Sequence, residues 1–170
     1  MNKIKKLIEK IGKPYVMVLI GPPLSGKTTF LKNFIEDDTY KHISSDALVL
    51  SLDKIQDGDY NRAWKEADWK LINKTLKSEI LESYKNRDNV VFDLTNLTHK
   101  RRRSNLSNFS KDYYKIAVIF PILSDNEYLY RNSKRNDEEN KNMSMHVIRR
   151  MISSYQPIRD NEGFDRVISL

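Results

Sequence analysis

The stretch Gly21-Pro22-Pro23-Leu24-Ser25-Gly26-Lys27-Thr28 fits the pattern G-x-x-x-x-G-K-[ST]. It follows the continuous apolar run Tyr15-Val16-Met17-Val18-Leu19-Ile20, which is typical of a buried parallel strand. We therefore expect a strand, a phosphate-binding loop (P-loop) and a helix from Lys27 to about Glu36. The alternative is a glycine turn that matches by chance, and the complete octapeptide behind a suitable strand disfavours it.

The chemistry of such a loop indicates nucleotide binding. Its backbone N–H groups point at phosphate oxygens, and the N-terminus of the following helix adds a favourable dipole. Lys27 is placed to reach the β- and γ-phosphates, and the Thr28 hydroxyl to ligate Mg²⁺. We expect residues 21–29, Thr29 included, to bind ATP or GTP. Leu24 stands where many P-loops have glycine, so the loop should be stiffer while it keeps its N–H groups.

Composition limits the remaining possibilities. The 170 residues suit one domain, and 30 Lys and Arg against 23 Asp and Glu give a net charge of +7, which favours a polyanionic partner. A generally basic composition explains the charge equally well. The absence of cysteine excludes a disulfide framework, cysteine-liganded zinc and thiol catalysis, and it is compatible with the cytoplasm. No apolar run approaches the ~20 residues of a membrane span, so we expect no membrane partner.

The spacing of apolar residues predicts an α/β protein of the P-loop NTPase type. About five strands should form a mostly parallel sheet with helices on both faces and a helical lid, in a single domain spanning 1–170. Residues 1–12 form an N-terminal helical extension, and Trp64 and Trp69 belong to one long core helix from Asn61 to about Tyr84. The other expected elements are a second strand ending at Ser44 or Ser45, strands over 89–93 and 115–120, helices from Thr98, from Ser124 to about Arg135 and from Met145 to before Pro157, and a fifth strand near the end.

Two carboxylates follow expected strands. Asp46 comes after the second strand, which we place beside the P-loop strand, and substrates of open α/β sheets bind at the carboxyl ends of strands. Its alternative role is to cap the following helix. Asp93 ends the third strand and is the better candidate for holding Mg²⁺.

Two groups of arginines are candidates for anion binding. Arg101, Arg102 and Arg103 occupy the first turn of a helix, where the dipole disfavours cations. This placement indicates either a nearby anion or a solvated basic face. Arg131 and Arg135 are four residues apart and share one helix face, as suits a lid for phosphoryl transfer.

These motifs together resemble the 5′-kinase domain of the phage polynucleotide kinase/phosphatase family and its bacterial relatives, over nearly the whole chain. The matching stretches are the P-loop, Ile43 to Asp46, Asp93 to Leu97 with the arginine run, Arg131 to Arg135, and Glu162 to Asp165. The resemblance implies that Lys27 and Thr28 contact triphosphate and metal, that Asp46 takes the proton of a 5′-hydroxyl, and that Arg135 clamps the donor phosphate. The family often holds the acceptor's 3′-phosphate with an arginine three residues after the base, where this chain has Val49. We expect no counterpart of the family's phosphatase domain.

The expected function is therefore transfer of the γ-phosphate of ATP to a 5′-hydroxyl end of DNA or RNA, as in nucleic acid repair. Asp46, Lys27, Arg131 and Arg135 would be catalytic, and Thr28 and Asp93 would bind magnesium. One alternative is a kinase of a small nucleoside or nucleotide acceptor, which Val49 favours. Another is a nucleotide-dependent binding module without phosphotransfer, which a carboxylate at position 46 disfavours.

Overall fold

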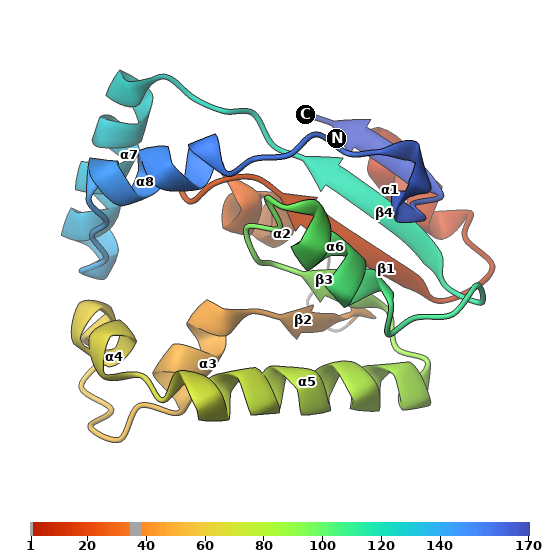
Figure 1. Cartoon of the computed structure of the whole chain (residues 1–170), viewed down its shortest axis with the longest axis horizontal. Coiled ribbons are helices and arrows are strands. Elements are labelled where there is room, and N and C mark those ends of the chain that lie inside the picture. Colours follow the sequence, from red (N-terminus) through yellow and green to blue (C-terminus); the bar gives the residue numbers. More distant parts are fainter. Residues whose placement is uncertain (1, 35–38) are drawn as a thin grey trace.

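The computed structural model describes residues 2–34 and 39–170, and its centre is a five-stranded sheet in which every pair of neighbours is parallel (Figure 1). The strand order is β2-β3-β1-β4-β5. This confirms the expected α/β class with its parallel sheet. The strands are β1 (Tyr15–Ile20), β2 (Lys41–Ile43), β3 (Val90–Phe92), β4 (Tyr114–Ile119) and β5 (Arg166–Ser169).

Helices cover both faces of this sheet, also as expected. They are α1 (Asn2–Glu9), α2 (Lys27–Phe34), α3 (Ser45–Ser51), α4 (Tyr60–Glu66), α5 (Trp69–Asn86), α6 (His99–Leu106), α7 (Asp125–Glu139) and α8 (Met145–Ser153), with a short 3₁₀ turn, η2, at Asp160–Glu162. None of the helices within 2–34 and 39–170 is long and apolar enough to cross a membrane.

The alternation of side chains along β1 divides the core into two layers. Val16, Val18 and Ile20 point to a cluster that includes side chains of α3, α4, α5 and α6. Tyr15, Met17 and Leu19 point to the opposite cluster, which α1 and α2 cover. Because β1 is buried on both sides, its carboxyl end is held rigidly where the P-loop begins.

The position of β2 differs from expectation, because β3 lies between β2 and the P-loop strand. Val90, Val91 and Phe92 are fully buried and require covering neighbours on both sides. Lys41 and His42 of β2 are exposed, and such polar residues suit an edge strand. The residue next to the P-loop strand's end is therefore Asp93, while Asp46 lies one strand further out.

The expected long helix is also wrong, since the chain forms α4 and α5 with a break between them. Asp68 stops the first helix by capping the second, because its carboxylate accepts a hydrogen bond from the Leu71 N–H at 3.0 Å. Trp64 and Trp69 flank this break, and each is 37% exposed rather than buried in the core. Ile72, Leu76 and Ile80 fill the core positions instead.

The ends of other helices require smaller corrections. The P-loop helix α2 reaches Phe34, and its expected end at Glu36 and the turn at Asp37 and Asp38 lie outside the described residues. Helix α7 continues past Arg135 to Glu139 and takes in part of the polar stretch expected to be a loop. The helices expected from Thr98 and from Ser124 begin there, and each of these two side chains caps its helix.

Candidate nucleotide and acceptor site

The P-loop connects β1 to α2, as its sequence predicts, and two positions explain its shape. A side chain on Gly21 would lie 2.7 Å from Ser25 Oγ and 2.8 Å from Phe120 Cβ, so only glycine fits. Leu24 adopts a left-handed backbone with φ of 64°. That conformation costs a non-glycine residue roughly 1–2 kcal/mol, which explains why glycine is frequent there. Leu24 therefore strains the loop, an effect that the sequence pattern does not indicate.

Lys27 turns its ammonium group into the loop itself. Its Nζ donates to the carbonyl oxygens of Gly21 at 3.0 Å and Pro22 at 2.7 Å. Burial lowers the pKa of Lys27 to about 8; the nearby carboxylates of Asp93 and Asp46 oppose this shift, and Arg135 adds to it. These four side chains therefore face a common space at the mouth of the P-loop.

The candidate metal ligands lie on the P-loop side of this space. Asp93 follows β3, its side chain is 8% exposed, and its Oδ2 lies 3.2 Å from His42 Nε2. Thr28 presents a hydroxyl in the first turn of α2. No cluster of three His, Asp or Glu side chains suitable for a metal occurs among the described residues. Mg²⁺ bound to a nucleotide needs no such cluster, because one or two protein oxygens, phosphates and water complete its shell.

Asp46 lies in the first turn of α3, and Ser44 occupies the N-cap position, so the helix-cap alternative for Asp46 is wrong. The hydroxyl of Tyr60, the first residue of α4, lies close to the Asp46 carboxylate. Burial and, secondly, Asp46 raise the pKa of Tyr60 well above its usual range. Tyr60 thus keeps its proton and is available to donate a hydrogen bond to the Asp46 carboxylate. No sequence pattern had pointed to Tyr60.

The two lid arginines approach from α7. Arg131 donates from Nη1 to the Leu24 carbonyl oxygen at 3.1 Å and from Nε to Glu127 Oε1 at 2.6 Å. Arg135 lies near enough to both Lys27 and Tyr60 to influence their pKa values. Its Nε is buried and has no hydrogen-bond partner among the described residues. A free donor beside Lys27 fits an incoming phosphate, so the residues present suit a nucleoside triphosphate.

The lid, which we define as α7, α8 and the connection 140–144, also touches α4 (Figure 1). Asn61 Nδ2 donates to the Asn140 carbonyl oxygen at 2.7 Å, and its Oδ1 accepts from the Asn142 N–H at 3.2 Å. Lys141, between these two, places its Nζ 4.5 Å from the centre of the Tyr60 ring. No pattern in the sequence indicates this lid contact, since the partners are about 80 residues apart.

The run from Arg101 to Arg103 contains both environments that its sequence indicates, a nearby anion and a solvated basic face. Arg102 is fully buried, and its Nε and Nη2 donate to Glu162 Oε2 and Oε1 at 2.6 and 2.8 Å. Burial opposes ionisation of Glu162, but hydrogen bonds from Arg102, Arg159 and His99 outweigh it and lower the pKa to about 2. The nearby anion is thus an internal carboxylate. Arg101 and Arg103 are exposed.

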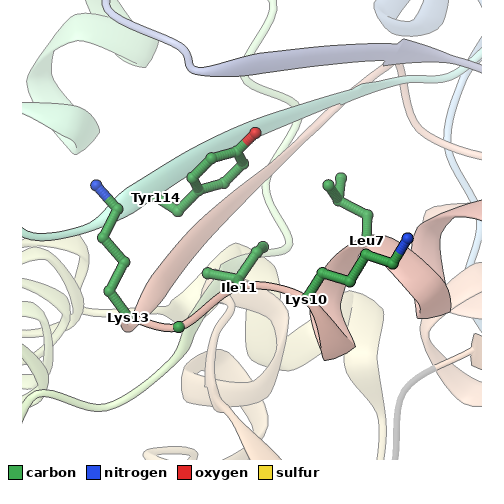
Figure 2. Close-up of a pocket in the computed structure, with 6 residues that line it drawn as sticks. Leu7, Lys10, Ile11, Lys13 and Tyr114 are labelled. Carbon is green, nitrogen blue, oxygen red and sulfur yellow. The ribbon is translucent and has the colours of Figure 1, made fainter.

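A separate cavity of about 420 Å³ lies away from this site, between α1 and the start of β4. Its lining includes Leu7, Ile11 and Tyr114, with Lys10 and Lys13 at its edge (Figure 2). Tyr114 is the first residue of β4, whereas the P-loop follows the last residue of β1. Because the strands are parallel, the cavity is at the opposite end of the sheet from the P-loop.

Comparison with known proteins identifies the family and the fold of this chain. A model of the family described as AAA domain matches residues 16–158. A search among curated proteins finds no match.

Solved structures resemble the fold at low sequence identity. A putative kinase from Chloroflexus aurantiacus J-10-fl has a TM-score of 0.63 and 14% identity, with 93% of this chain and 85% of that chain covered. A gluconokinase from Sinorhizobium meliloti 1021 has a TM-score of 0.54 and 17% identity, with 92% and 82% covered. A chain of the Pnkp1/Rnl/Hen1 complex has a TM-score of 0.51 and 20% identity, with 90% and 44% covered. These likenesses establish a P-loop kinase-like fold.

Proposed function

The chain belongs to the AAA domain family and has a P-loop kinase-like fold, and from this premise we propose that it transfers the γ-phosphate of ATP to a 5′-hydroxyl end of DNA or RNA. The observation that carries the proposal is that the Asp46 carboxylate and the Arg135 guanidinium both lie near the P-loop lysine Lys27, with Tyr60 close to Asp46. A phosphate-binding loop alone would serve a nucleotide-binding module. A fixed carboxylate facing that loop supplies what a phosphotransferase needs in addition, a group that accepts the acceptor's proton.

Each group in the site has a role that its position supports. Bound MgATP supplies the phosphoryl group, and Thr28 and Asp93 are the oxygen ligands available to its metal. Lys27 exchanges its bonds to the Gly21 and Pro22 carbonyls for phosphate oxygens. Arg131 and Arg135 extend from the lid to neutralise charge on the transferring group. Asp46 takes the proton of the acceptor hydroxyl, with Tyr60 holding its carboxylate in place.

The nucleic-acid acceptor is supported by the resemblance of the Arg131 to Arg135 and Ile43 to Asp46 stretches to polynucleotide kinases and by the net charge of +7. A small hydroxylated acceptor is the second candidate. Val49, which is 2% exposed within the core, favours it, because α3 presents no cation to an acceptor at that position. One solved structure of similar fold is a gluconokinase, a small-molecule kinase.

A labelling experiment separates these candidates. The protein is incubated with γ-labelled ATP, Mg²⁺ and, in parallel, 5′-hydroxyl DNA, 5′-hydroxyl RNA, nucleosides, nucleoside monophosphates and gluconate. We expect label in the 5′-hydroxyl oligonucleotides, and its loss in Lys27→Ala. Exclusive labelling of a nucleoside, a nucleotide or gluconate would overturn the polynucleotide proposal.

A further inference from the structure

A lysine of the lid lies on the acceptor side of the site rather than on the donor side. The Nζ of Lys141 is 4.5 Å from the centre of the Tyr60 ring, and the hydroxyl of that ring lies close to Asp46. Of the arginines on the same lid, Arg131 reaches the P-loop at Leu24, and Arg135 lies near both Lys27 and Tyr60. The described lid therefore carries cations to both sides of the site.

The position of Lys141 is fixed by its backbone and not by chance packing of a flexible chain. Asn61 of α4 bonds the residues on either side of it, through the Asn140 carbonyl and the Asn142 N–H. Asn132 braces the connection from α7, because it donates to the Met143 carbonyl at 2.9 Å and accepts from the Met143 N–H at 3.2 Å. These bonds hold Lys141 over Tyr60.

The surroundings of the Lys141 ammonium group leave room for an anion. Its carboxylate neighbour is Glu139, with Oε2 at 3.5 Å and a half-exposed side chain, so this contact is weak. The face of Tyr60 attracts the cation without neutralising it. Lys141 itself is 20% exposed. A partly desolvated lysine with a weak partner binds a phosphate more strongly than a surface lysine does.

We propose that Lys141 is a specificity-determining residue that binds a phosphate of the acceptor beside the hydroxyl that Asp46 deprotonates. This inference rests on the proposed function, because it requires an acceptor with both groups. It also predicts coupling, since the lid that binds the donor through Arg131 and Arg135 binds the acceptor through Lys141. By linkage, a triphosphate and a phosphorylated acceptor should each raise the affinity for the other.

The test uses Lys141→Met, Lys141→Arg and, as a matched control on the same lid, Lys134→Met. Lys134 is exposed and pairs only with Glu138 at 3.8 Å among the described residues. The acceptors are a nucleoside 3′-phosphate and the same nucleoside with a free 3′-hydroxyl. Binding is followed by the fluorescence of Trp64, whose ring lies 5.7 Å from Tyr60, with and without a non-hydrolysable ATP analogue, and KM and kcat are measured in parallel.

Wild type should bind the 3′-phosphate at least about 10-fold more tightly than the free nucleoside, as expected for one charge-assisted contact. Lys141→Met should abolish this preference in both Kd and KM with little change in kcat, and it should abolish the gain from the ATP analogue. Lys141→Arg and Lys134→Met should keep the preference. Equal weakening of both acceptors, or a fall in kcat alone, would show that Lys141 only supports Tyr60 and would overturn the inference. Phosphate-dependent binding that requires Lys141 but leads to no transfer would support the inference and refute the proposed kinase activity.

Discussion

Removing the ammonium group of Lys27 is the most informative change. Its buried charge lowers the free energy of unfolding, while the same charge is needed to bind the nucleotide. Its pKa is lowered from 10.5 to about 8, mainly by burial. At 1.36 kcal/mol per pKa unit, keeping this charge in the folded state costs about 3 kcal/mol. Lys27→Met removes that cost but also the hydrogen bonds to Gly21 and Pro22, worth about 1 kcal/mol each. The variant should therefore be about 1–2 kcal/mol more stable at pH 7.

The pH dependence identifies the cause. A lysine with a lowered folded-state pKa destabilises the protein fully below pH 8, and the cost disappears as pH rises from 8 to 10.5, because the folded protein releases the proton that the unfolded chain keeps. For these two pKa values the cost falls by about 1 kcal/mol between pH 7 and pH 9. The stability advantage of Lys27→Met should shrink by the same amount.

Thermal and denaturant unfolding without nucleotide, at pH 7 and pH 9, measure both effects. An advantage of 1–2 kcal/mol corresponds to a rise in Tm of about 2–8 °C for a chain of this size. Lys32→Met, an exposed change in the last turn of the same helix, is the control and should show a pH-independent difference. MgATP should raise the Tm of wild type and of Lys32→Met but not of Lys27→Met. A less stable Lys27→Met at pH 7, or an advantage equal at both pH values, would refute the buried-charge reasoning.

Three further changes test other parts of the site and its support. Asp46→Asn should lower kcat by about 10²- to 10⁴-fold in single-turnover assays with little change in ATP affinity, and retention of more than about a tenth of kcat would exclude a base role. Asp93→Asn should raise the Mg²⁺ concentration needed for half-maximal rate, and an unchanged Mg²⁺ titration would exclude it as a ligand. Glu162→Gln should lower the free energy of unfolding by about 3 kcal/mol at pH 7, because Arg102 loses its buried counter-ion. Since the pKa of Glu162 is lowered to about 2, this loss should be full above about pH 4.5 and disappear as pH falls toward 2, and a pH-independent difference would contradict the ion-pair explanation.

The part of the fold that depends on local patterns could be predicted from the sequence. The apolar run of β1 with Gly21 to Thr28 behind it requires a strand, a loop and a helix, and the structure has them. Thr98 and Ser124 begin helices because their hydroxyls satisfy N–H groups a few residues away. Such signals act within one turn of the chain and need no knowledge of tertiary packing.

Strand order and helix breaks could not be predicted in the same way. Both β2 and β3 are short, and β2 contains a single apolar residue, Ile43, whereas β3 is wholly apolar. The polar Lys41 and His42 suit an edge strand, but they do not indicate that β3 lies between β2 and the P-loop strand. Asp68 sits within a continuous helical pattern, and its preference for capping Leu71 over continuing the helix is a close competition. The exposure of Trp64 follows from that break.

The acceptor side of the site depends on contacts between distant parts of the chain. Tyr60 meets Asp46 because α3 and α4 pack together, and Lys141 meets Tyr60 because Asn61 binds the lid. No spacing rule in one sequence connects residues about 80 positions apart. The donor side, in contrast, is encoded in the contiguous P-loop, so Lys27 and Thr28 could be identified from the sequence while Tyr60 and Lys141 could not.

The measurement that tests the central claim most directly is the balance of products with a 5′-hydroxyl oligonucleotide. Wild-type protein, MgATP and the oligonucleotide are followed by ³¹P NMR, which separates ADP, inorganic phosphate and a 5′-phosphomonoester in one sample. The account predicts ADP and 5′-phosphomonoester in equal amounts, with both formed at least about 100-fold more slowly by Asp46→Asn. ADP accompanied by inorganic phosphate, with no 5′-phosphomonoester, would contradict it.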